Sequence, residues 1–172
     1  MEITGLDHLY LTVSDFERSQ AFYDRVMRAL GFFKVDAPIG GDRHAHYFNR
    51  AMQISIRPAR SSVRHDPYAP GLHHLCLQVP DRAAVDEAHA ILAGLGVPAT
   101  PPALYPEYAG DYYATFFSDP DGLRLELVAR RSGRDAVVRE WNELRSFEDP
   151  MKELRERAAR AGSEPDPGHS EE

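Results

Sequence analysis

GLHHLCLQV, residues 71–79, alternates apolar and polar side chains, as a strand with one buried face does. The apolar set is Leu75, Leu77 and Val79, and the polar set is His74, Cys76 and Gln78. LDHLYLTV, residues 6–13, repeats this pattern at a constant offset (74 − 8 = 66 residues) and puts His8 and Tyr10 on its polar face. Two histidines at equivalent places of two repeats can meet at one pseudo-twofold axis.

A helix is predicted after each of these two strands. Ser14-Asp15-Phe16-Glu17 has the pattern of a capping box, and the apolar stripe that follows runs to Leu30-Gly31. The second helix is predicted over residues 81–95 and ends at Leu95-Gly96. The offset between the two helix ends (95 − 30 = 65) shows that the repeat extends beyond the strands with one deletion.

Three further strands are predicted in each half. They cover residues 32–35, 43–49 and 52–57 in the first half, and 97–100, 112–118 and 123–129 in the second. The sequence therefore predicts an α+β protein made of two tandem βαβββ modules, with the polar linker 59–70 between them. Module one spans residues 1–58, module two spans 71–131, and together they form the domain 1–131.

Beyond the second module the repeat stops. Residues 132–160 are predicted to be a helical extension, and we expect Trp141 on its apolar stripe to be buried against the modules or a second subunit. Residues 161–172 are acidic and lack large apolar side chains, so the sequence predicts a disordered tail.

Composition limits the classes of partner. The 172 residues carry a net charge of −7, which argues against nucleic acid or an anionic membrane as the main partner. Cys76 is the only cysteine, so no internal disulfide can form. The sequence has no apolar run of membrane-spanning length and no signal-peptide pattern, and we therefore expect a cytoplasmic protein.

Three residues on polar strand faces carry the predicted chemistry: His8, His74 and Glu126. Two neutral imidazoles and a carboxylate form a three-ligand site with open positions, which suits Fe(II), Mn(II) and related ions. The structural alternative is two core histidines and a Glu126 that is paired with Arg124 or Arg57. A carboxylate on a half-buried strand is costly without a cation or donors, so the three residues together favour a metal site.

The paired modules, the histidine on the first strand of each and DPDGLRLEL at residues 119–127 resemble the vicinal oxygen chelate superfamily. That superfamily includes glyoxalase I, type I extradiol dioxygenases, fosfomycin-resistance enzymes and bleomycin-resistance proteins. The resemblance implies a cupped mixed sheet around a central cavity, with the helices outside. It also implies one divalent metal ion (Fe, Mn, Ni or Zn) with His8, His74 and Glu126 as its ligands.

The sequence departs from that pattern at two positions. Glyoxalase I enzymes add a carboxylate where this chain has Ser55, which counts against a glyoxalase site. Extradiol and fosfomycin enzymes commonly carry a tyrosine where this chain has Phe116. Tyr112, four residues earlier with the same parity, is the candidate catalytic residue in its place.

Several other side chains are predicted to line the substrate cavity. They are Tyr10, Tyr47, Ser55, Cys76, Gln78, Phe116 and Arg124. Tyr47 is included because it is taken as the equivalent of Phe116 in module one. Alternation along that strand then places His44 and His46 on the opposite face, away from the metal.

The function predicted from the sequence is a divalent-metal-dependent enzyme of the glyoxalase or dioxygenase type, acting on a small molecule with vicinal oxygens. The alternative is a non-catalytic drug- or metabolite-binding protein of the bleomycin-resistance type. A third reading, an enzyme that opens an epoxide antibiotic, needs a cationic pocket, for which Arg124 is the one candidate. The expected partners are a small molecule and, as one option, a second copy in a homodimer.

Overall fold

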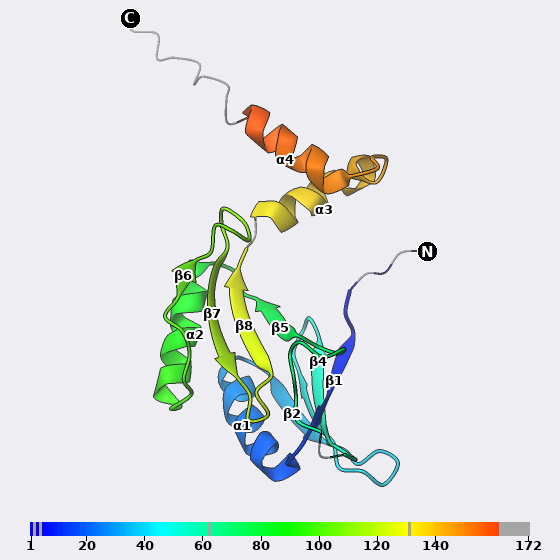
Figure 1. Cartoon of the computed structure of the whole chain (residues 1–172), viewed down its shortest axis with the longest axis vertical. Helices are drawn as coiled ribbons and strands as arrows, with labels where there is room; N and C mark the ends of the chain where they lie inside the picture. The colour runs from blue at the N-terminus through cyan, green and yellow to red at the C-terminus, as the bar shows by residue number, and fades with distance from the viewer. Residues whose placement is uncertain (2, 4, 62, 131, 162–172) are drawn as a thin grey trace, which may run out of the picture. The chain divides into compact units, whose positions relative to one another are not determined.

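The computed structural model describes residues 1–161 except residues 2, 4, 62 and 131. It contains two compact units, Met1–Ala129 and a second that begins at Arg130. The first unit holds two four-stranded sheets (Figure 1). The tail predicted over residues 161–172 lies, apart from Ala161, outside the described residues.

Module one forms the first sheet. Its elements are β1 (His8–Val13), α1 (Phe16–Ala29), β2 (Phe33–Asp36), β3 (Ala45–Phe48) and β4 (Gln53–Pro58). The strand order is β1-β4-β3-β2, with β1 parallel to β4 and the other pairs antiparallel.

Module two repeats this topology. Its elements are β5 (His74–Gln78), α2 (Arg82–Gly94), β6 (Ala103–Leu104), β7 (Tyr113–Ser118) and β8 (Arg124–Ala129). The strand order β5-β8-β7-β6 matches that of module one element by element. The predicted α+β fold of two βαβββ modules is confirmed.

One predicted strand is misplaced. Residues 97–100 make only the isolated bridge Ala99–Phe117, and the short strand β6 lies further along the chain. The reason is the proline content of residues 98–102, since proline has no N–H for a ladder hydrogen bond.

Each helix packs on one face of its own sheet. The buried stripe of α1 includes Tyr23, Val26 and Met27, and it faces Ile54 and Ile56 of β4. In module two, Val85, Ala88 and Leu92 form the buried stripe of α2. One cluster of buried apolar residues contains side chains of both modules, so the modules share a core. The opposite face of each sheet carries the polar side chains of the first strand of its module, His8 and Tyr10 in β1 and His74 and Cys76 in β5.

The start of α1 corrects a sequence prediction. The N-cap is Asp15, whose carboxylate accepts a hydrogen bond from the Arg18 N–H at 3.0 Å. Ser14 instead donates its backbone N–H at 2.7 Å, and its hydroxyl, to the Asp121 carboxylate of module two. Arg18 also pairs with Asp121 at 2.7 Å. The expected capping residue therefore joins the two modules.

A second link between the modules is buried. The Tyr23 hydroxyl of α1 donates to Asp119 at 2.9 Å, in the turn that precedes β8. Burial, and then the charge of Asp119, raises the pKa of Tyr23 well above its ordinary value, so the hydroxyl stays protonated as a donor.

Replacing Tyr23 with Phe should lower the free energy of unfolding by about 1–3 kcal/mol, because it leaves one oxygen of the buried Asp119 carboxylate without its donor. Urea unfolding measures the change. Tyr113→Phe is the matched control, because its hydroxyl donates to the exposed Asp86 and its loss should cost less than about 0.5 kcal/mol. Equal losses in the two variants would contradict the role of the buried link.

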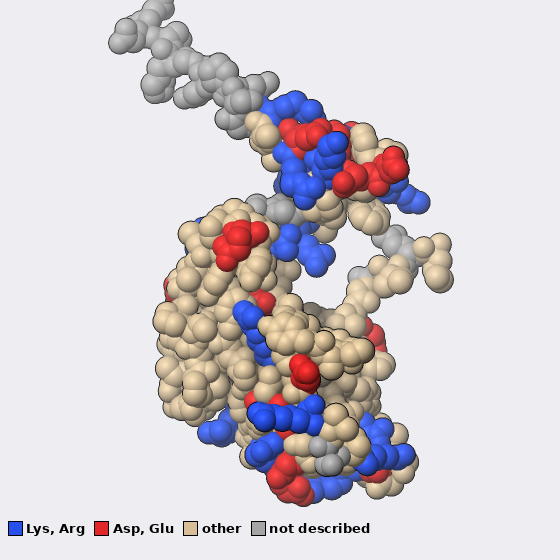
Figure 2. Space-filling view, in the orientation of Figure 1, with Lys and Arg blue, Asp and Glu red and all other residues tan. Residues whose placement is uncertain are grey.

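The second unit is helical, as predicted. It contains α3 (Ser132–Leu144) and α4 (Pro150–Ala161), with Leu144 and Leu154 buried. Arg157 pairs with three carboxylates, those of Glu140, Glu143 and Glu153, and charges of both signs intermix over these helices in Figure 2. Trp141 of α3 is 47% exposed, and its burial against the modules or a second subunit stays a prediction. Within the described part of the chain, no helix has the length and apolarity to cross a bilayer.

Candidate functional site

The polar face of module two gathers around Glu126. In the parallel β5–β8 pair, Cys76 lies opposite Glu126, and Phe116 of β7 lies on the other side of it. The Glu126 residue is only 2% exposed. One carboxylate oxygen, Oε1, accepts a hydrogen bond from the Tyr112 hydroxyl at 2.5 Å. The other, Oε2, lies 3.6 Å from Nε2 of His74.

The two arginines of the structural alternative have other partners. The Arg124 guanidinium lies over the Phe116 ring, 4.0 Å from its centroid. Arg57 pairs with Asp42 in module one. A buried carboxylate is strongly destabilising unless hydrogen bonds or a cation compensate for its lost hydration. Among the described residues, the Glu126 carboxylate therefore has a tyrosine hydroxyl and an imidazole beside it, but no arginine.

Tyr112 belongs to an aromatic cluster that covers this face. Its ring meets Tyr108 edge to face at 5.2 Å, Tyr108 stacks on Tyr105 at 6.0 Å, and Tyr105 meets Phe116 at 5.2 Å. Burial, and then the hydrogen bond to Glu126, raises the pKa of Tyr112 far above its ordinary value. Its hydroxyl is thus a proton donor at neutral pH.

The polar face of module one carries His8. Tyr10 lies opposite Ser55 in the β1–β4 pair, as Cys76 lies opposite Glu126, so the register makes Ser55 the equivalent of Glu126. The His8 ring contacts Asp7 and Tyr10. Its sheet therefore offers an imidazole and a hydroxyl where module two offers an imidazole and a carboxylate.

Both candidate ligand histidines are held at the same ring nitrogen by the preceding residue. Nδ1 of His8 lies 2.7 Å from the Asp7 carboxylate, and Nδ1 of His74 lies 2.7 Å from Nδ1 of His73. This arrangement leaves Nε2 of each ring for a ligand, as metal-binding histidines commonly have. Asp7 and His73 were not among the predicted site residues, although the offset of 66 residues pairs them (73 − 7 = 66).

Three residues of β3 and its approach lie on the faces opposite to those predicted. Tyr47 is buried on the helix side, where its hydroxyl donates to Asp24 of α1 at 2.9 Å, so it is not a cavity residue. His46 lies opposite Ser55 and contacts its hydroxyl oxygen at 2.8 Å. The His44 ring stacks on His46 at 5.9 Å, and both rings contact Tyr10.

The physical reason is hairpin length. Phe116 and Glu126 are ten residues apart (126 − 116 = 10), whereas their structural equivalents His46 and Ser55 are nine apart (55 − 46 = 9). A shift of one residue moves every side chain of a strand to the other face. The residue of module one that is equivalent to Phe116 is therefore His46 rather than Tyr47.

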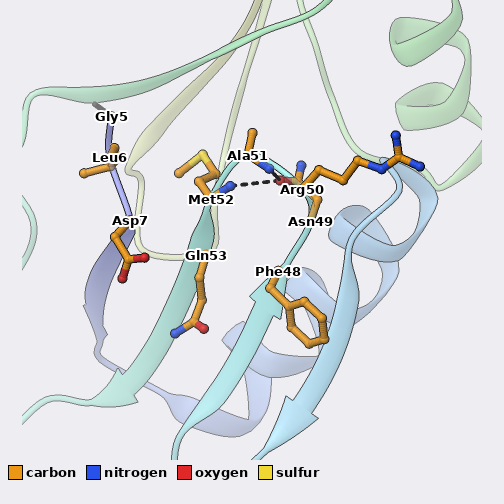
Figure 3. A pocket seen from close by; sticks show the side chains of 9 residues that line it. All are labelled: Gly5, Leu6, Asp7, Phe48, Asn49, Arg50, Ala51, Met52 and Gln53. Atoms are coloured by element: carbon orange, nitrogen blue, oxygen red, sulfur yellow. Dashed lines mark hydrogen bonds between the residues drawn. The ribbon is translucent and has the colours of Figure 1, made fainter. Parts of the chain in front are cut away.

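A hollow of about 470 Å³ opens beside the start of β1 (Figure 3). It lies between the chain leading into β1 and the β3–β4 turn, and its lining includes Asp7, Phe48 and Gln53. The turn is fixed by the Asn49 side chain, which accepts hydrogen bonds from the N–H groups of Ala51 and Met52. The pocket thus borders the Asp7–His8 pair.

Residues 5–127 match the family model of the Glyoxalase/Bleomycin resistance protein/Dioxygenase superfamily. The chain belongs to this superfamily. It is similar to the uncharacterized protein YwkD of Bacillus subtilis, with 30% identity over 74% of this chain and 98% of the relative. The crystal structure of a glyoxalase family protein from Enterococcus faecalis is 26% identical, covers 74% of this chain and 99% of its own, and has a TM-score of 0.60.

A superfamily structure with a bound metal has the same fold. It is a mutant of the fosfomycin resistance protein FosX from Listeria monocytogenes, complexed with Mn(II) and 1S,2S-dihydroxypropylphosphonic acid. It is 22% identical, covers 74% of this chain and 93% of its own, and has a TM-score of 0.56. That relative therefore holds a metal ion and a small molecule on the fold that this chain shares.

In the present chain, the donor atoms of two of the three predicted ligands lie close enough to share one divalent ion. Nε2 of His74 and Oε2 of Glu126 are 3.6 Å apart, so one ion can contact both at the usual distances of about 2.1 Å. The described residues of one chain, however, contain no group of three histidine, cysteine or acidic side chains able to hold an ion. His8, the third predicted ligand, belongs to the other sheet and contacts neither of the two.

Proposed function

We propose that this protein is a divalent-metal-dependent enzyme that acts on a small molecule with two adjacent oxygen atoms. The ion would be held by His8, His74 and Glu126, and its identity would be Fe, Mn, Ni or Zn. When bound, it would polarise the two substrate oxygens and stabilise the negative charge that develops on them.

The observation that carries this proposal is the environment of Glu126. The residue is almost fully buried, and its partners are the Tyr112 hydroxyl and the His74 imidazole, neither of which carries the fixed charge of an arginine or lysine. A buried carboxylate that has an imidazole nitrogen but no lysine or arginine beside it, within the described part of the chain, is a donor set that a metal ion would complete.

The chain's own residues would orient the substrate around that ion. Cys76 and Phe116 flank Glu126 on the sheet, and Arg124 lies over Phe116. An apolar ring with a guanidinium over it suits a substrate with a flat apolar part and a negative or polar end. Module one offers a cluster of two imidazoles and a phenol, from His44, His46 and Tyr10, that can hydrogen-bond polar groups.

We propose further that the third ligand comes from a second copy of the chain. His8 lies on the open face of module one, in one row with Gln53, Phe48 and Phe33. Phe33 is 71% exposed and Phe48 is 37% exposed, so this face presents large apolar side chains beside the histidine. Such a patch favours coverage by another protein surface. The module-two face of a second copy would cover it and bring His74 and Glu126 to His8.

Metal binding by the wild-type protein tests the proposal. Protein purified without chelator should contain a divalent ion, and its unfolding midpoint should rise with added Mn(II), Fe(II), Ni(II) or Zn(II), because an ion that binds only the native state stabilises it by mass action. A chelator should reverse the gain. If no ion raises the midpoint and the chelator has no effect, the protein is instead a small-molecule binding protein without a metal.

A further inference from the structure

We propose that Tyr112 is a positioning residue that makes Glu126 bind the metal through one oxygen only, which keeps a third coordination position open beside the two that a chelating substrate takes. This inference rests on the proposed metal site and adds a function for a residue outside it. Tyr112 acts on the ion through Glu126 rather than by contact with the ion itself.

The two oxygens of Glu126 have different partners. Oε1 receives the Tyr112 hydroxyl at 2.5 Å, whereas Oε2 faces Nε2 of His74 at 3.6 Å. A hydrogen bond to a carboxylate oxygen is strong when the donor is neutral and the acceptor is charged. The oxygen on the imidazole side is therefore available to an ion, and the other is occupied by a donor.

Tyr112 is held in this orientation through both its backbone and its ring. Its backbone carbonyl accepts from the N–H of Tyr105 at 2.8 Å, and its own N–H donates to the carbonyl of Ala109 at 3.0 Å. Its ring packs edge to face on Tyr108, which stacks on Tyr105. These backbone hydrogen bonds and ring contacts fix the direction of the Tyr112 hydroxyl. If Glu126 turned both of its oxygens toward the ion, the hydrogen bond from Tyr112 to Oε1 would break.

The difference between one and two bound oxygens sets the number of free positions. Carboxylates bind cations with either one or both oxygens. Two imidazoles and a one-oxygen carboxylate occupy three positions of an octahedral ion, and a two-oxygen carboxylate would make four. A substrate that chelates through adjacent oxygens takes two positions, so the one-oxygen mode leaves a third for water or another reactant.

Mn(II) alone is the probe in the test, and the enhancement of water-proton relaxation counts the exchangeable waters on the bound ion at saturation. Wild type should retain about three, because three protein atoms occupy an octahedral ion. Tyr112→Phe keeps the ring and removes the donor, which frees Oε1, so the count should fall by about one. Tyr113→Phe is the matched control, because its hydroxyl donates to Asp86 on α2, and it should give the wild-type count.

Each result has one meaning. A wild-type count of about two overturns the inference without any variant, because it shows both oxygens on the ion. An unchanged count in Tyr112→Phe overturns it, and so does loss of Mn(II) binding by a folded Tyr112→Phe protein, since a freed carboxylate should still bind. If wild type binds no Mn(II) or any other divalent ion, the proposed metal site itself has failed.

Discussion

Glu126→Gln should weaken the binding of Mn(II) by about 100-fold or more while the fold survives, because removing a direct charged ligand exceeds the 10–100-fold cost of disturbing the residues behind a ligand. Glutamine keeps the shape of the side chain but cannot supply a negative oxygen. The added-metal rise in the unfolding midpoint, present in wild type, should vanish in the variant. Isothermal titration with Mn(II) and thermal unfolding with and without the ion measure the two effects.

The metal-free stability of the same variant separates the two interpretations of Glu126. An ion pair with Arg124 or Arg57 would make Glu126→Gln lose about 3–5 kcal/mol whether or not metal is present. The observed contacts give Glu126 no such partner, so the metal-free loss should be much smaller. Glu87→Gln, an exposed acidic residue of α2, is the control and should leave both measurements unchanged. A large loss of metal-free stability with an intact response to metal would contradict the site.

Mixing two variants that each bind no metal should restore binding if the site is shared between copies. When His8→Gln and Glu126→Gln are refolded together, half of the dimers are mixed, and each mixed dimer has one site with His8 from one chain and His74 and Glu126 from the other. The expected Mn(II) capacity is about one quarter of wild type, by the statistics of a twofold dimer. Equilibrium dialysis measures this capacity directly.

The matched control uses two variants of the same half-site. His74→Gln and Glu126→Gln alter residues that lie on one module, so no mixed dimer of these two contains an intact site. This mixture should bind no more Mn(II) than either variant alone. Recovery in neither mixture, with normal binding in wild type, would place the whole site within one chain.

Binding of Mn(II) to the wild-type protein should also weaken as the pH is lowered, because the imidazoles must lose their protons to bind the ion.

The sequence alone determined the module order and the polar face of the first strand of each module. Alternation of period two is a local property, and the constant offset between residues 6–13 and 72–79 carried it from one module to the other. The observed register bears this out, since Tyr10 lies opposite Ser55 as Cys76 lies opposite Glu126. The alignment of Ser55 with Glu126 therefore followed from sequence.

Only the tertiary structure decided three features of the site. The side of the sheet on which His46 and Tyr47 lie depends on a hairpin one residue shorter in module one, and strand pairing rather than composition sets that length. The contact of Tyr112 with Glu126 depends on how a loop folds over a sheet. The separation of His8 from His74 and Glu126 depends on how two modules pack, which is a long-range property that no local pattern of residues encodes.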